Sequence, residues 1–197
     1  QIQLYLILVS EVEFQIAWTN TNKMKRGQIW IETVIYTLIG LSLIGVVLVV
    51  TLPKITEFKD RATIEQTIDA LNIFNSKVQD VLSAPGNTRE VRLKMKRGTL
   101  QVNGESEEII FVLDSIDTKY SEPGINITSG KVNIRTDIFG SDYKVTLGLN
   151  YSKYDILYGG ESNKNEIFSG VSIPYEFIIE NQGVDTNGKP KINIRLS

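Results

Sequence analysis

Residues 33–52, "TVIYTLIGLSLIGVVLVVTL", form twenty consecutive positions without a charged side chain, most of them Ile, Leu, Val or Gly. An α-helix of that length rises about 30 Å, which matches the hydrocarbon thickness of a bilayer. The alternative is a buried helix of a soluble domain, but such helices rarely stay apolar on every face over this length. The run therefore predicts a membrane-spanning helix.

The residues after the apolar run continue a helical pattern on one face only. Pro53 removes a backbone donor, so we expect it to end or kink the apolar segment. Beyond it, apolar residues recur every three or four positions, as in an amphipathic helix: Ile64, Ile68, Leu71, Phe74, Val78 and Val81. The stretch 84–87, Ala-Pro-Gly-Asn, stops this pattern. Residues 28–83 are thus predicted to form one long helix, which spans a membrane to about residue 53 and is amphipathic after it.

The remaining residues, 84–197, show the period of β-strands. From Glu90 onward apolar residues alternate with other residues, in the runs 91–95, 145–151, 175–179 and 192–196. Turn-forming pairs separate such runs: Asn103-Gly104, Ser129-Gly130, Gly159-Gly160 and Asn187-Gly188. We expect about seven to nine antiparallel strands, with the helical stripe as the lid of one sheet face. The predicted fold class is α+β: a long N-terminal helix followed by an antiparallel β-sandwich-like or rolled-sheet domain.

Composition limits the chemistry that the chain offers. The 197 residues carry a formal net charge of -2, which gives no general reason to expect a nucleic-acid partner. Because the chain contains neither cysteine nor histidine, it has no disulfide, no thiol nucleophile and no imidazole base or metal ligand. We therefore predict a protein that is not an enzyme, without catalytic residues, cofactor or metal site.

The residues ahead of the long helix divide into two parts. Residues 1–23 contain a short apolar patch without a basic leader, which is a poor secretory signal. Met24 is the first methionine and is followed directly by Lys25-Arg26-Gly27. We expect translation to begin at Met24, give residues 1–23 no role, and interpret residues 24–27 as a basic prepeptide.

One carboxylate interrupts the apolar surroundings near the start of the helix. Glu32 costs several kcal/mol in or near hydrocarbon unless a partner neutralises it. Lys25 and Arg26 lie six or seven residues away, beyond the reach of side-chain pairs on a helix. If the chain were cut after Gly27, the new α-amino group of Gln28 in a neighbouring copy would supply the missing cation.

These residues resemble a known family. The tripeptide Lys25-Arg26-Gly27, then Gln28, then Glu32 at the fifth mature position and a long apolar helix, is similar to the class III signal peptide of archaeal type IV pilins. Trp30 and Tyr36 stand where that family's usual mature start has Ser and Leu. The resemblance implies a prepilin peptidase that cuts between Gly27 and Gln28, and a filament built from apolar helices.

The resemblance also implies a place in the cell and a set of partners. The precursor would be inserted in the membrane, and the mature subunit would join other copies of itself in a surface filament for adhesion, with an extracellular β domain in residues 84–197. Glu32 would set the axial register of each incoming helix, as a buried polar residue does in a coiled coil. Two alternatives stay open: Glu32 snorkels at the surface of an ordinary anchor, or the N-terminal glutamine cyclises and leaves Glu32 with hydrogen bonds alone.

Two acceptor patterns agree with an extracellular β domain. Residues 126–128 and 150–152 fit N-x-S/T, so Asn126 and Asn150 are candidate N-glycosylation sites. The alternative function is a single-pass anchored protein whose extracellular β domain binds a partner and never polymerises. A more distant one is a membrane-tethered hydrolase that uses Asp114 and Asp117. The basic residues of the 89–97 stretch are interpreted as the solvent face of a strand.

Overall fold

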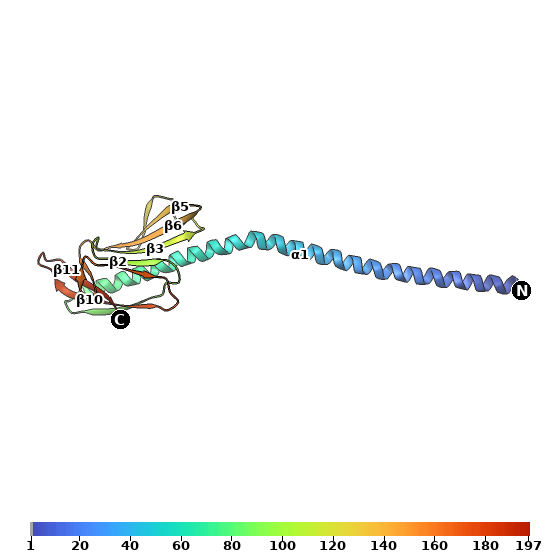
Figure 1. Ribbon diagram of the computed structural model, residues 1–197, viewed down its shortest axis with the longest axis horizontal. Helices are drawn as coiled ribbons and strands as arrows, with labels where there is room; N and C mark the ends of the chain where they lie inside the picture. Colours follow the sequence, from blue (N-terminus) through green and yellow to red (C-terminus); the bar gives the residue numbers. More distant parts are fainter. Residues whose placement is uncertain (1) are drawn as a thin grey trace. The chain divides into compact units, whose positions relative to one another are not determined.

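A computed structural model describes the backbone of residues 2–197 and the side chains of residues 29–197. The chain divides into two compact units, residues 1–54 and residues 55–197. The first unit is the N-terminal part of the helix α1 (Ile2–Val81), and the second contains the rest of α1 and every strand (Figure 1).

The bounds of α1 differ from the prediction at both ends. The helix begins at Ile2, upstream of residue 28, because residues 2–26 contain neither glycine nor proline to stop it. Pro53 lies inside the helix, in agreement with the prediction of one long helix through this position. Because a proline removes only one backbone hydrogen bond, the many other hydrogen bonds of this 80-residue helix keep it continuous at Pro53. At the other end α1 stops at Val81, close to the predicted residue 83.

The strands form two sheets. Sheet A has the spatial order β1 (Thr88–Leu93), β10 (Tyr175–Val184), β11 (Pro190–Leu196), β7 (Asp155–Tyr158) and β8 (Glu161–Ser162). Sheet B has the order β4 (Asn126–Ser129), β5 (Val132–Phe139), β6 (Asp142–Asn150), β3 (Glu108–Ile116), β2 (Thr99–Asn103) and β9 (Asn165–Ser169). This arrangement confirms the predicted α+β fold, a long N-terminal helix followed by predominantly antiparallel sheets.

The strand count and one pairing differ from the prediction. The described chain has eleven strands, not seven to nine. The additional strands β4 and β8 are short and exposed along their whole length, so no buried alternation marks them in the sequence. The segment 159–166, which begins with the predicted turn pair Gly159-Gly160, contains β8 and the start of β9. One pairing, β11 with β7, is parallel; between these two strands the chain passes through β8, through β9 of sheet B and through β10.

The core forms where residues 55–81 of α1 lie between the two sheets (Figure 1). The predicted apolar stripe is confirmed, because all six of its side chains are buried: Ile64, Ile68, Leu71, Phe74, Val78 and Val81. Phe74 meets Phe177 of sheet A edge to face, with ring centroids 6.2 Å apart. Toward sheet B, the Tyr151 hydroxyl donates a hydrogen bond of 3.2 Å to Asn75 Oδ1. The helix is thus held by contacts to both sheets.

Candidate functional site

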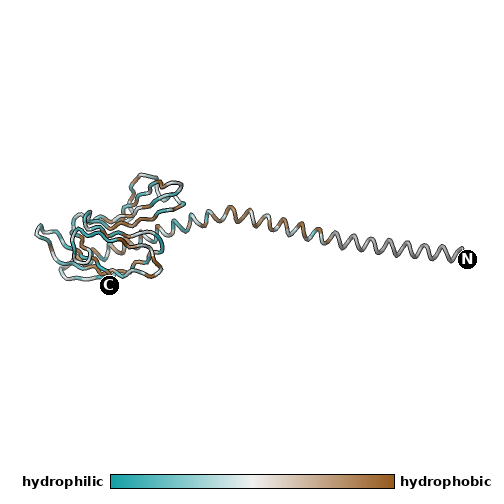
Figure 2. Tube along the Cα trace, viewed as in Figure 1, coloured by the Kyte–Doolittle hydropathy of each residue, from teal (hydrophilic) through white to brown (hydrophobic). Residues whose placement is uncertain are grey.

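The first candidate site is the apolar surface of α1. Within the described residues one helix, starting at Ile29, is long and apolar enough to cross a membrane, and the mean hydropathy of its apolar window is 2.5. None of that window is buried inside the chain. Figure 2 shows it as a predominantly apolar stretch that follows the residues drawn in grey. Side chains of this kind require lipid or other protein around them.

The Ser and Thr side chains of this segment form hydrogen bonds within the helix. The hydroxyls of Thr33, Thr37, Ser42 and Thr51 each donate a hydrogen bond to the carbonyl oxygen four residues earlier, at 2.7–2.9 Å. A hydroxyl that bonds back to its own helix needs no water. These four positions therefore fit a nonaqueous environment as well as their apolar neighbours do.

Glu32 carries the only charged side chain of residues 29–52. It lies on α1 at an exposed position, one turn from the first residue whose side chain the structure describes. The side chain at the predicted cleavage position, Gln28, lies outside the described side chains, as does Gly27. The described part of this site is therefore one carboxylate near the start of the exposed apolar segment of α1.

The second candidate site is the junction where α1 enters the β domain. Asp60 is 3% exposed, and its Oδ1 accepts a hydrogen bond of 2.8 Å from Arg97 Nη1. Its Oδ2 accepts a hydrogen bond of 3.1 Å from the Asp117 backbone N–H. Arg97 Nη2 also donates to the carbonyl of Ser115, at 2.8 Å. A buried carboxylate needs such partners, so these contacts fasten the helix to sheet B.

Sequence reasoning missed this junction, although one signal was present. Asp60 lies four residues before Ile64, at the next position of the apolar stripe, where a carboxylate implies a buried partner. The sequence predicts Arg97 on the solvent face of a strand. About half of its side chain is exposed, but its guanidinium pairs with the buried Asp60 carboxylate. Asp114 and Asp117 contribute backbone groups to the junction, the former through its carbonyl oxygen.

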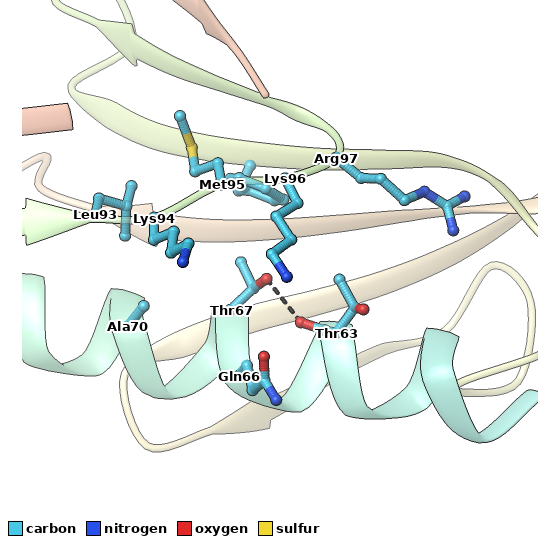
Figure 3. A pocket seen from close by; sticks show the side chains of 10 residues that line it. Thr63, Gln66, Thr67, Ala70, Leu93, Lys94, Met95, Lys96 and Arg97 are labelled. Atoms are coloured by element: carbon cyan, nitrogen blue, oxygen red, sulfur yellow. Dashed lines mark hydrogen bonds between the residues drawn. The ribbon is translucent and has the colours of Figure 1, made fainter. Parts of the chain in front are cut away.

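The third candidate site is a groove between α1 and the connection from β1 to β2. It is lined by Thr63, Gln66, Thr67 and Ala70 of the helix and by the side chains from Leu93 to Arg97, as Figure 3 shows. Thr67 donates its hydroxyl to the Thr63 carbonyl, so this hydroxyl is already engaged. Lys94 and Lys96 alternate with buried Leu93 and Met95, which confirms the predicted solvent face of this segment.

The two candidate glycosylation sites lie on one face of sheet B. In β6, Val145, Leu147 and Leu149 are buried toward α1, so Asn150 points to the opposite, outer face. Asn126 pairs with Arg135, whose neighbours in β5 are likewise buried, and shares that outer face. Both asparagines line one shallow depression there. The sequence alone did not predict that Asn126 and Asn150 line the same depression.

The surroundings of the two asparagines differ. Asn126 is exposed on the edge strand β4. The Asn150 side chain is engaged, because its Nδ2 donates a hydrogen bond of 3.2 Å to Glu108 Oε1 and its Oδ1 accepts one of 3.0 Å from the Ser152 backbone N–H. The amide nitrogen to which a glycan would attach is therefore more accessible at Asn126.

Comparison of the chain with protein-family models, with curated proteins and with solved structures finds no match.

Proposed function

We propose that this chain is the structural subunit of an archaeal type IV pilus-like surface filament. The subunit is inserted in the membrane as a precursor, cut between Gly27 and Gln28 by a prepilin peptidase, and assembled with other copies through residues 28–53. The β domain is then displayed outside the cell, where it mediates adhesion.

The observation that supports the proposal best is the exposed helix surface of residues 29–52. Its apolar side chains find no cover within the chain, and its Ser and Thr hydroxyls are bonded internally. Such a helix suits both environments that a pilin meets, first lipid and then a bundle of identical helices. Burial of its apolar surface against neighbouring copies contributes about 25 cal/mol per Å².

Glu32 supplies the specificity that apolar packing lacks. Apolar helices can slide past one another at little cost, whereas a buried polar side chain favours one axial register, as it does in a coiled coil. The α-amino group of Gln28 in a neighbouring copy is the partner that cleavage creates. The proposed contact selects one register and makes assembly depend on processing.

Mass spectrometry of the mature N-terminus tests the processing step. The expected result is a chain that begins at Gln28, either as free glutamine or as its cyclised form. A chain in the native membrane that retains Lys25-Arg26-Gly27 would contradict the proposal and favour the alternative, a single-pass anchored protein with an extracellular binding domain.

Electron microscopy of surface filaments tests the role of Glu32. Glu32→Ala is expected to abolish filaments, while Glu57→Ala, which removes an exposed carboxylate from the same helix beyond the apolar segment, should leave them intact. Glu32→Gln separates charge from hydrogen bonding. Loss of filaments in this variant indicates an ionic pair with a free amine, and normal filaments indicate a neutral, cyclised N-terminus. Normal filaments from Glu32→Ala would count against the proposed register.

A further inference from the structure

The end of the β domain from which α1 leaves presents exposed apolar side chains on two connections. The bond between Asp60 and Arg97 marks this end, because Asp60 is the first buried residue of α1 among those described. The opposite end is marked by Val81, whose carbonyl oxygen accepts a hydrogen bond of 3.0 Å from Asn181 Nδ2.

The first connection is the hairpin between β5 and β6. Tyr143 pairs with both Ile116 and Ile138, so these three residues form one row across sheet B. Asp117, the next residue after Ile116, bonds to Asp60. The hairpin tip therefore lies at the α1 exit, and its side chains Ile138 and Phe139 are 69% and 59% exposed.

The second connection joins β9 to β10. The Val171 N–H donates to the Met95 carbonyl at 2.8 Å, and the Gly170 N–H donates to the Gly98 carbonyl at 2.9 Å. Met95 and Gly98 flank Arg97, so this connection also lies at the α1 exit. Its Ile173 is 76% exposed, and Val171 is exposed as well. On the helix itself, Phe58 is exposed two residues before Asp60.

We propose that this apolar exit surface, defined as Phe58, Ile138, Phe139, Val171 and Ile173, rests on the lipid surface while the subunit is inserted in the membrane. Covalent connectivity limits the distance, since Asp60 follows Leu52 by eight residues, or about 12 Å of helix. The headgroup region adds about 5–8 Å on each side of the hydrocarbon. Phe58 is nearer still, six residues or about 9 Å of helix after Leu52, so the exit surface begins close to the headgroup region.

Lipid is favoured over a second copy because of where the surface begins. Phe58, the first residue of the exit surface, lies on the same helix as the segment that is apolar enough to cross a membrane, six residues after Leu52. Large apolar side chains at the interface gain free energy by burying about 5–10 Å into the boundary between headgroups and acyl chains. The proposal rests only on the membrane-inserted precursor of the proposed function, not on filament assembly.

The natural absence of cysteine allows a direct test. The full chain, carrying a single cysteine labelled with an environment-sensitive fluorophore, is reconstituted into zwitterionic phosphatidylcholine vesicles. Labels at Phe139→Cys and Ile173→Cys report whether the exit surface lies in a lipid or an aqueous environment. The matched control is Val184→Cys, an equally exposed apolar position near the end of β10, three residues past Asn181. Resistance to alkaline extraction verifies insertion of each variant.

The expected result is emission at shorter wavelength at positions 139 or 173 than at 184, with about twofold stronger quenching by lipids that carry a headgroup quencher. Inserted protein with equal emission and quenching at all three positions would overturn the proposal. Protection that depends on protein density and not on the lipid quencher would also overturn it, and would indicate a second copy as the occupant. If alkaline extraction shows that the chain does not insert into the vesicles, this result contradicts the membrane insertion on which the proposed function depends.

Discussion

Asp60 of α1 and Arg97 of the β1–β2 connection are 37 residues apart in the chain, and their side chains form an ion pair of 2.8 Å. The carboxylate is buried, while about half of the guanidinium side chain is exposed. The pair joins the helix to the β domain two turns beyond the apolar segment.

Arg97→Ala is expected to destabilise the β domain by about 1–3 kcal/mol, because it leaves a buried carboxylate without its cation while solvent screens part of the loss. The control is Arg92→Ala, which removes a surface pair with Glu176 and should cost under about 1 kcal/mol. Denaturant titration of the full chain in detergent measures both. Equal effects of the two variants would show that the junction adds nothing beyond a surface ion pair.

Phe74→Ala should cost about 3–5 kcal/mol, since it removes a fully buried ring that contacts Phe177 and leaves a cavity between α1 and sheet A. Its neighbour Ile73 is exposed, so Ile73→Ala is expected to stay within about 0.5 kcal/mol. Thermal or denaturant unfolding compares them. Similar losses at both positions would contradict the burial of the helical stripe between the sheets.

Burial raises the pKa of the Tyr151 phenol far above its ordinary value of 10.0, with a smaller contribution from Tyr154. A raised pKa means that the contribution of this phenol to stability is complete below pH 10 and declines as pH rises above it, because the phenol ionises first in the unfolded chain. Between about pH 10 and 11.5, the free energy of unfolding of Tyr151→Phe should fall less steeply with pH than that of the natural chain. An unchanged alkaline profile in this variant would indicate that other groups control the transition.

Two glycines with positive φ differ in their surroundings. A Cβ on Gly130 would lie 2.5 Å from Asn72 Oδ1, an atom that accepts a hydrogen bond from the Lys131 N–H, whereas a Cβ on Gly140 would meet nothing within 4 Å. Gly140→Ala should cost about 1–2 kcal/mol from backbone strain alone. Gly130→Ala should cost about 1 kcal/mol more, since Asn72 must move. Unfolding curves that rank them in the reverse order would contradict the contact between α1 and the β4–β5 turn.

Glycan attachment is expected to be higher at Asn126 than at Asn150, because the Asn150 amide is held by Glu108 and Ser152. Intact-mass measurement of the native protein beside Asn126→Gln and Asn150→Gln variants measures the occupancy of each site. The larger loss of mass should accompany Asn126→Gln. Equal or reversed losses would show that these hydrogen bonds do not limit modification.

Local patterns in the sequence determined the long helix with its buried stripe and the strands whose buried residues alternate, but not the short exposed strands β4 and β8. The period of Ile64 to Val81 marked the buried stripe of α1, and each of the four glycine-containing turn pairs lies at a connection between consecutive strands. The apolar run and Glu32 were readable without any fold, because length, hydropathy and charge are properties of adjacent residues. These features depend on neighbours a few positions away, which the sequence lists directly.

Tertiary structure alone decided the arrangement of those elements. It paired Asp60 with Arg97, placed β7 beside β11 in parallel, and brought Asn126 and Asn150 to one face of sheet B. It also gathered the tips at Phe139 and Ile173 at the exit of α1. The physical reason is that strand order and helix docking are set by the burial of many distant apolar side chains at once, and no local period records which distant segment will supply the cover.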